Sequence, residues 1–192
     1  LKMRQIISKE KKEKTEKRNQ VIIGVLLVVI MFFSVAAYSF QKDKNNNSGT
    51  TVKYNSFEFV KQNDLWVLNT GGINLAFRYN PNEVEEIGGY LNLLDSYSNK
   101  PLYISSENIE ANQEIYQNMN LFVLRIREAC LDEKECQENL PVKTCEDNFI
   151  IIKEAELSKI YQQDNCVFIE GKEENLTKLS DEFMFKILGI RQ

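Results

Sequence analysis

The sequence predicts an α+β protein, in which one N-terminal transmembrane helix is followed by a domain with a mixed sheet, two amphipathic helices and two disulfides. Three observations support this fold class: an uncharged apolar run near the N-terminus, several short runs typical of strands, and two longer stretches with apolar residues at helical spacing. Because the first strands follow one another with only short turns between them, α+β is favoured over a regular alternation of strands and helices.

The transmembrane helix is predicted for residues 21–40, a run of 20 residues that begins at Val21, ends at Phe40 and contains no charge. At about 1.5 Å per residue, a helix of this length crosses a hydrocarbon core about 30 Å thick. Residues 1–20 carry a net charge of +5, whereas the rest of the chain carries −9. The positive-inside rule therefore places this basic tail in the cytoplasm and residues 41–192 outside, in a single-pass protein of the cell membrane.

The same apolar run has a second interpretation, a signal peptide cleaved near Ala36 and Ala37. The run is longer than the usual apolar region of a signal peptide and the basic segment before it is long, which favours an uncleaved anchor. Residues 41–51 are polar and rich in Asn, which is typical of a short tether. The folded extracytoplasmic domain is then expected to cover residues 52–192, about the usual size of one domain.

The first half of this domain is predicted to be a β-meander. The runs SFEFV, LWVLN and INLAFRY are separated by QND and by Thr70-Gly71-Gly72, which indicates tight turns between antiparallel strands. The TGG segment is too short for a phosphate loop and is interpreted as a hairpin turn. Trp66, in the second run, is expected to pack in the sheet, and PNEVEEI after the third run is expected to form one helical turn.

The second half is predicted to contain three strands and two helices. The runs PLYIS, NFIIIK and CVFIE indicate strands, and the stretch between the last two fits either a short helix or a long hairpin. The first helix is expected to run from residue 107 to about 131, with Ser106 as its cap. A second apolar stripe follows Gly171, and Gly189 suits the end of that helix.

The four cysteines have the spacing C-x5-C-x8-C-x20-C. Structural zinc sites use tighter pairs of cysteines, and thioredoxin-like redox chemistry needs C-x-x-C, so neither pattern is present. An even number of cysteines outside the cytoplasm favours two disulfides. Of the three pairings, the sequence positions favour Cys130–Cys136, after the first helix, and Cys145–Cys166, between the late strands.

Composition lowers the expectation of several chemistries. The chain has no histidine, which excludes His-dependent triads and His-ligated zinc. An acidic ectodomain argues against nucleic acid as a partner, because phosphate binding needs a basic surface. We predict no catalytic, cofactor or metal site; Asp181, beside apolar residues of the last helix, is expected to be a partly buried structural carboxylate. Asn46 and Asn175 lie in glycosylation sequons that face outward in this topology.

The segments NLPVKTCEDNFIII, DNCVFIEG and SDEFMFKILGI, in about the last third of the chain, carry a resemblance to a known group. They resemble uncharacterised small single-pass membrane proteins of archaea with a disulfide-containing ectodomain. The resemblance implies a prokaryotic surface location, and it brings no activity, catalytic residue or partner with it.

The sequence favours a non-catalytic, membrane-anchored interaction or accessory module of an envelope assembly. The expected partners are the lipid bilayer, through residues 21–40, and a membrane or envelope protein within reach of the short tether. Two alternatives stay open: a surface hydrolase that uses paired carboxylates, which needs a raised pKa in a pocket, and a solute-binding domain with a cavity.

Overall fold

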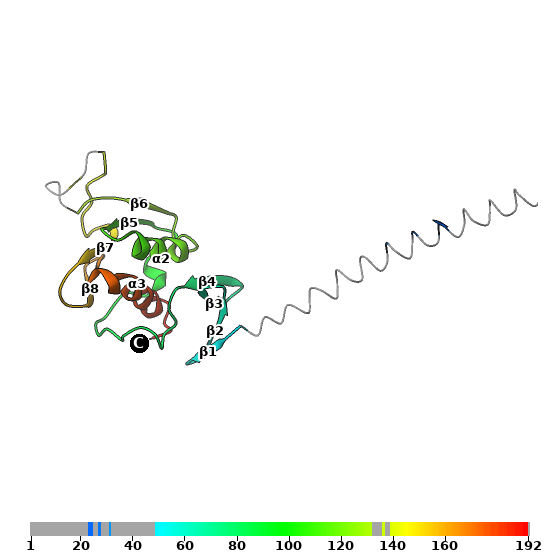
Figure 1. Cartoon of the computed structure of the whole chain (residues 1–192). Helices are drawn as coiled ribbons and strands as arrows, with labels where there is room; N and C mark the ends of the chain where they lie inside the picture. Colours follow the sequence, from blue (N-terminus) through cyan, green and yellow to red (C-terminus); the bar gives the residue numbers. More distant parts are fainter. Residues whose placement is uncertain are drawn as a thin grey trace, which may run out of the picture. The chain divides into compact units, whose positions relative to one another are not determined.

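The computed structural model describes residues 49–131, 136 and 139–191, together with Ile23, Gly24, Leu27 and Met31 (Figure 1). The chain divides into two units, Leu1–Ser48 and Gly49–Gln192. The predicted cytoplasmic tail and tether up to residue 48, and the transmembrane helix except for the four helical residues named above, lie outside the described residues. In the part of the chain that is described, no helix is both long and apolar enough to span a membrane.

The second unit begins with an antiparallel meander of four strands. In chain order and in space these are β1 (Thr51–Tyr54), β2 (Phe57–Gln62), β3 (Leu65–Thr70) and β4 (Ile73–Phe77). The predicted meander is confirmed. It contains one strand more than predicted, β1, whose first residue, Thr51, is the last residue of the segment assigned to the tether. Gly71 and Gly72 have φ values of 58° and 81°, so the predicted hairpin turn is confirmed as one that needs two left-handed residues.

The second sheet has five strands in the order β6-β5-β7-β9-β8. Strands β5, β6, β7 and β9 are parallel to one another, and β8 runs antiparallel to β9 at one edge. The prediction of one mixed sheet is therefore corrected to an antiparallel sheet and a separate mixed sheet. The undecided stretch before CVFIE is an arm of a hairpin. The strands are β5 (Pro101–Ser106), β6 (Arg125–Glu128), β7 (Asn148–Glu154), β8 (Lys159–Gln163) and β9 (Cys166–Gly171).

The prediction of one helix over residues 107–131 is wrong in its second half. Helix α2 (Ile109–Met119) is capped by Asn108, whose side chain accepts from the Ala111 N–H, rather than by Ser106. The chain then turns and forms β6, in which Ile126 lies opposite Leu102 of β5. The apolar spacing after Met119 suits a helix and a strand equally, and pairing with β5 decides between them.

Helix α3 (Glu173–Ile187) confirms the second predicted helix. Its end is a Schellman motif: Gly189 has a φ of 69° and donates to Lys186 O, and Ile190 N–H donates to Phe185 O. A short 3-10 helix, η1 (Leu94–Ser96), precedes β5. The predicted helical turn after Pro81 is instead a non-helical turn, in which Glu83 N–H donates to Asn80 O.

The two faces of the mixed sheet are covered by different parts of the chain. Residues at alternate positions, such as Ile104, Ile150 and Ile169, belong to a large core shared with α2, α3 and the meander. The opposite face forms a smaller core of Tyr103, Ala129, Phe149, Ile151, Cys166 and Phe168. Cys145 packs against this smaller core, and Lys143 Nζ lies 4.4 Å from the Tyr103 ring. The connection between β6 and β7 therefore covers the face that the helices leave open.

Candidate functional site

The four predicted disulfide cysteines are paired as the sequence suggested. Cys130 bonds to Cys136, with Cα atoms 5.3 Å apart, and Cys145 bonds to Cys166, with Cα atoms 4.9 Å apart. Neither bond leaves a free thiolate, so these cysteines do not ligate a metal. The second bond joins the connection before β7 to a buried residue of β9, and therefore fastens this connection to the sheet.

The two predicted glycosylation residues have different outcomes. Asn46 lies outside the described residues. Asn175 lies in the first turn of α3, where its N–H donates to Lys172 O, and Thr177 of the same sequon is buried. The folded domain therefore presents this sequon inside a helix.

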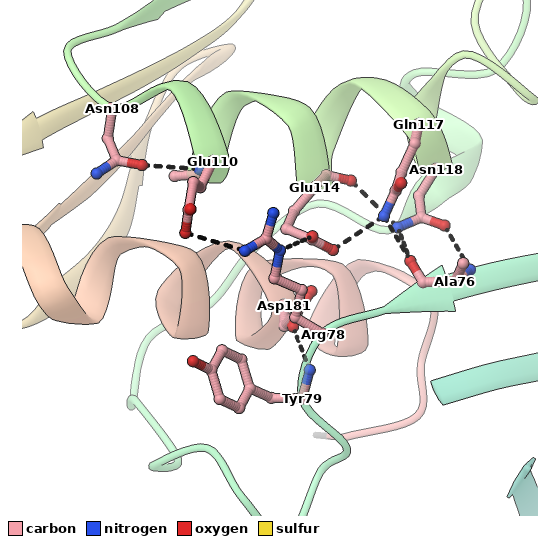
Figure 2. Close-up of polar contacts among 10 residues, drawn as sticks. Ala76, Arg78, Tyr79, Asn108, Glu110, Glu114, Gln117, Asn118 and Asp181 are labelled. Atoms are coloured by element: carbon pink, nitrogen blue, oxygen red, sulfur yellow. Dashed lines mark hydrogen bonds and ion pairs between the residues drawn. The ribbon is translucent and has the colours of Figure 1, made fainter. Parts of the chain in front are cut away.

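A buried carboxyl pair joins the meander to both helices (Figure 2). Glu114 of α2 is 2% exposed, and Asp181 of α3 is fully buried. Arg78, immediately after β4, places Nε 3.1 Å from Glu114 Oε1 and Nη1 3.0 Å from Glu110 Oε2. Asp181 Oδ2 accepts from the Tyr79 N–H at 2.9 Å. The prediction of a partly buried Asp181 was therefore too weak, because this side chain is enclosed on all sides.

Burial dominates the electrostatics of this pair. Loss of water raises the pKa of Asp181 well above its usual range; the negative charge of Glu114 raises it further, and the Tyr79 N–H opposes the shift. Burial also raises the pKa of Glu114, against the effect of the Arg78 charge. The pair has the raised pKa that a carboxylate hydrolase needs. The pair is not accessible to a substrate, however, because α2, α3 and the end of β4 enclose both carboxyl groups.

A second buried cluster holds the C-terminal end of the domain. Arg191 Nη1 lies 2.5 Å from Glu182 Oε2, and its Nη2 donates to Pro81 O. Lys186 Nζ donates to Ile87 O at 2.7 Å. Burial raises the pKa of Glu182 from 4.5 to about 7, although the Arg191 charge opposes the shift. These contacts fasten α3 and the chain end to the long segment after β4.

Among the described residues, one cleft lies where the connections of the parallel strands diverge. From β5 the chain passes through α2 to β6 on one side, and β7 pairs with β5 on the other side. Parallel strands bring their carboxyl ends to one edge, and ligands of open α/β sheets bind at such a switch point. The ends of β5, β6 and β7 there line a cleft of about 710 Å³, which we name the switch-point cleft.

The polar lining of the switch-point cleft comes from all three strand ends and from α2. Beyond the strand ends, the disulfide-bonded Cys130 and the side chain of Phe168 complete the wall. Asn112 Oδ1 is buried and has no hydrogen-bond partner among the described residues. The polar and charged side chains that line the cleft are Ser105, Ser106, Glu107, Asn112, Glu128 and Lys153.

A second region is an exposed aromatic and aliphatic surface beside the edge strand β8. Tyr90 is 85% exposed, Leu93 is 57% exposed and Tyr161 of β8 is 37% exposed; we name these three residues the Tyr90 surface. The Asn92 N–H donates to Gln162 Oε1 at 2.8 Å, which fastens this segment to β8. Two depressions of about 580 and 430 Å³ flank it, and both are lined by Gly89 and Tyr161.

The sequence prediction missed the cleft, the Tyr90 surface and Glu114. Only Glu114 had a usable signal, because it follows Ala111 by three residues and precedes Ile115 on the apolar stripe of α2. The cleft depends on strand order, and the Tyr90 surface on a contact between segments 70 residues apart. Comparison of the chain with protein-family models, with curated proteins and with solved structures gives no match.

Proposed function

We propose that the chain is a single-pass membrane protein whose folded unit works outside the cytoplasm as an interaction module of an envelope assembly. In this proposal residues 21–40 anchor the protein in the bilayer, residues 1–20 stay in the cytoplasm, and the partner is a membrane or envelope protein. The module is non-catalytic, and it acts by holding a partner close to the membrane.

The observation that carries the proposal is the Tyr90 surface. Large apolar side chains that lie together on a surface are typical of protein contacts, and tyrosine is enriched among the residues that dominate binding energy. The main chain beneath is held in place, because the Asn92 N–H donates to Gln162 Oε1 and Gly89 packs closely on β8, where a Cβ would lie 3.0 Å from Ile160 O. A surface that is ordered before binding loses little conformational entropy when a partner docks.

The two disulfides and the charge distribution support the extracytoplasmic location. Disulfides persist in oxidising compartments and are rare in the cytosol of most organisms. The net charge of +5 before the apolar run, against −9 for the rest of the chain, favours the same orientation.

A test of the interaction uses the full chain in the membranes of its own host. We expect the wild-type protein to migrate in a complex larger than its own mass on native electrophoresis. Tyr90→Ser combined with Leu93→Ser should shift most of the protein to the smaller species. Leu124→Ser is the matched control, since Leu124 is 66% exposed beside β6, at the sheet edge opposite β8. A complex that survives the double change, or that the control disrupts equally, contradicts the proposal.

Orientation is tested separately with reporters fused to the C-terminus. Alkaline phosphatase folds only outside the cytoplasm and green fluorescent protein matures inside, so the proposal expects an active phosphatase fusion and a dark fluorescent fusion. The opposite pattern would place the disulfide domain in the cytoplasm and would remove the proposed location.

A solute-binding role has one observation in its favour, the switch-point cleft. Its volume of about 710 Å³ lies within the usual range for small-ligand sites. The hydrolase alternative has weaker support, because the carboxyl pair with raised pKa values is enclosed by protein.

A further inference from the structure

We propose that the switch-point cleft binds a protonated amino group. The ligand is either a free organic amine or a lysine side chain of a protein partner; both present the same ammonium chemistry. This inference concerns a different surface from the Tyr90 surface, and it holds whether or not the proposed envelope assembly exists.

The strand topology supplies the position of the site. The residues that line the cleft include Ser105 and Ser106 at the end of β5, Glu128 at the end of β6, and Lys153 near the end of β7. These strands are parallel neighbours, so their polar ends converge at one edge of a rigid sheet. A site built on strand ends is held more firmly than one built on loops.

The charge of the lining favours a cationic ligand. Glu107 and Glu128 contribute two carboxylates to the cleft and Lys153 contributes one ammonium group. Lys153 is already neutralised, because its Nζ lies 3.3 Å from Glu170 Oε1. The Tyr161 hydroxyl donates to the same oxygen of Glu170 at 2.8 Å, which holds this partner in place. The cleft therefore keeps a negative charge that no described lysine or arginine of its lining cancels.

The hydrogen-bonding capacity of the lining points the same way. Asn112 Oδ1 is a buried acceptor, and leaving such an acceptor without a donor is unfavourable. A primary ammonium group carries three N–H donors and no acceptor. It can therefore donate to Asn112 Oδ1 while its charge interacts with a carboxylate of the rim.

An anionic ligand fits the same cleft poorly, although the N-terminus of α2 lies beside it. One N–H of the first turn of that helix is taken, since the Ala111 N–H donates to Asn108 Oδ1. Glu107 and Glu110 flank the helix start and would repel an anion there. The negative side chains of the chain itself therefore weaken the attraction of this helix end for an anion.

The test measures binding of two ammonium probes to the full chain in detergent by titration calorimetry. The probes are 1,5-diaminopentane, which represents a free amine, and an N-acetylated, C-amidated Gly-Lys-Gly peptide, which represents a partner side chain. Pentane-1,5-diol and the matching Gly-Gln-Gly peptide are the uncharged controls. We expect saturable binding of at least one ammonium probe, weakened by salt, and no binding of either control. The probe that binds more tightly identifies the source.

Three variants locate the site on the chain. Glu128→Gln and Asn112→Leu should each weaken binding about tenfold, whereas Asn112→Asp, which keeps an acceptor and adds charge, should bind at least as tightly as the wild type. Glu156→Gln removes an exposed carboxylate that does not line the cleft, and it should leave the affinity unchanged. Equal melting temperatures establish that each variant is folded. Failure of both ammonium probes to bind, equal binding of the uncharged controls, or equal losses for Glu128→Gln and Glu156→Gln would overturn the proposal.

Discussion

Asn118 shows how a single side chain can take the place of a neighbouring strand. Strand β4 is the edge of the meander, so its outer backbone groups have no strand to pair with. The Asn118 side chain accepts from the Ala76 N–H at 3.0 Å and donates to Ala76 O at 2.8 Å. It thereby reproduces the pair of hydrogen bonds that another strand would make, and it joins α2 to the meander.

Replacing Asn118 with leucine should lower the free energy of unfolding by about 2 kcal/mol. Leucine keeps most of the volume but leaves the half-buried Ala76 N–H without its acceptor. Gln113→Leu, on the exposed face of the same helix, is the control and should change stability little. Thermal unfolding followed by fluorescence of the sole tryptophan, the buried Trp66, gives the measurement. Equal stability of the two variants would show that this pairing contributes nothing.

Residues with a local role were predicted from the sequence more successfully than residues with a distant partner. Gly71, Gly72 and Gly189 were assigned correctly because their backbone geometry depends on neighbours within a few positions. Asn118 and Glu114 were missed, because the role of a polar residue on an apolar helix stripe can be assigned only when its partner is known. Those partners are Ala76 of β4 and Arg78 immediately after it.

At the scale of elements, the connection from β6 to β7 covers one face of the mixed sheet, a position that helices occupy in most sheets of parallel strands. Such sheets are normally covered on both faces, and here α2 and α3 lie on one face only. The other face is covered by the connection, which the Cys145–Cys166 bond attaches to β9. The disulfide thus completes a layer of the fold.

The two disulfides should differ in their effect on stability. Cys145 and Cys166 are 21 residues apart, whereas Cys130 and Cys136 are 6 apart. In the chain-entropy model, loss of the Cys145–Cys166 bond costs about 3 kcal/mol and loss of the Cys130–Cys136 bond costs about 2 kcal/mol. Paired replacement by alanine, followed by denaturant titration, checks the order.

Loss of the Cys145–Cys166 bond has a second expected signature. Release of the connection should uncover Tyr103, Phe149 and Phe168, and should increase binding of a hydrophobic dye, whereas the Cys130–Cys136 variant should not. The reverse order of stability, or no difference in dye binding, would mean that the connection covers this face without its bond.

At the scale of the whole molecule, buried charges join parts that are distant in the chain. The Arg78–Glu114–Asp181 cluster links the end of β4 to both helices, and Arg191 with Glu182 links the chain end to Pro81. Three carboxyls in these clusters have raised pKa values because they are buried. The folded state therefore holds protons that the unfolded state releases.

Stability should fall as the pH rises between about 5 and 7. A carboxyl whose pKa is raised on folding stabilises the protein below its unfolded pKa, and this contribution is lost as the pH passes through the folded pKa. For Glu182 that interval runs from 4.5 to about 7. Melting temperatures measured from pH 5 to pH 8 should therefore decrease.

The variant Asp181→Asn separates the buried pair from other ionisable groups. Asparagine keeps an acceptor for the Tyr79 N–H and cannot ionise, so part of the pH dependence should disappear. The exposed Glu156→Gln should retain the full slope. A wild-type melting temperature that rises from pH 5 to pH 8 would mean that these carboxyls are ionised in the folded state.

The sequence by itself determined the α+β class, most strands, the last helix and the hairpin turn, and it favoured the observed pairing of the cysteines among three possible pairings. These features depend on periodicity and spacing within short segments. Only the tertiary structure decided that residues 125–128 form β6, that the strands divide into two sheets, and that Glu114 meets Asp181. The position of the switch-point cleft was likewise decided only by the tertiary structure. Each of these features needs a partner far away in the sequence, and local pattern carries no information about which distant segment will supply it.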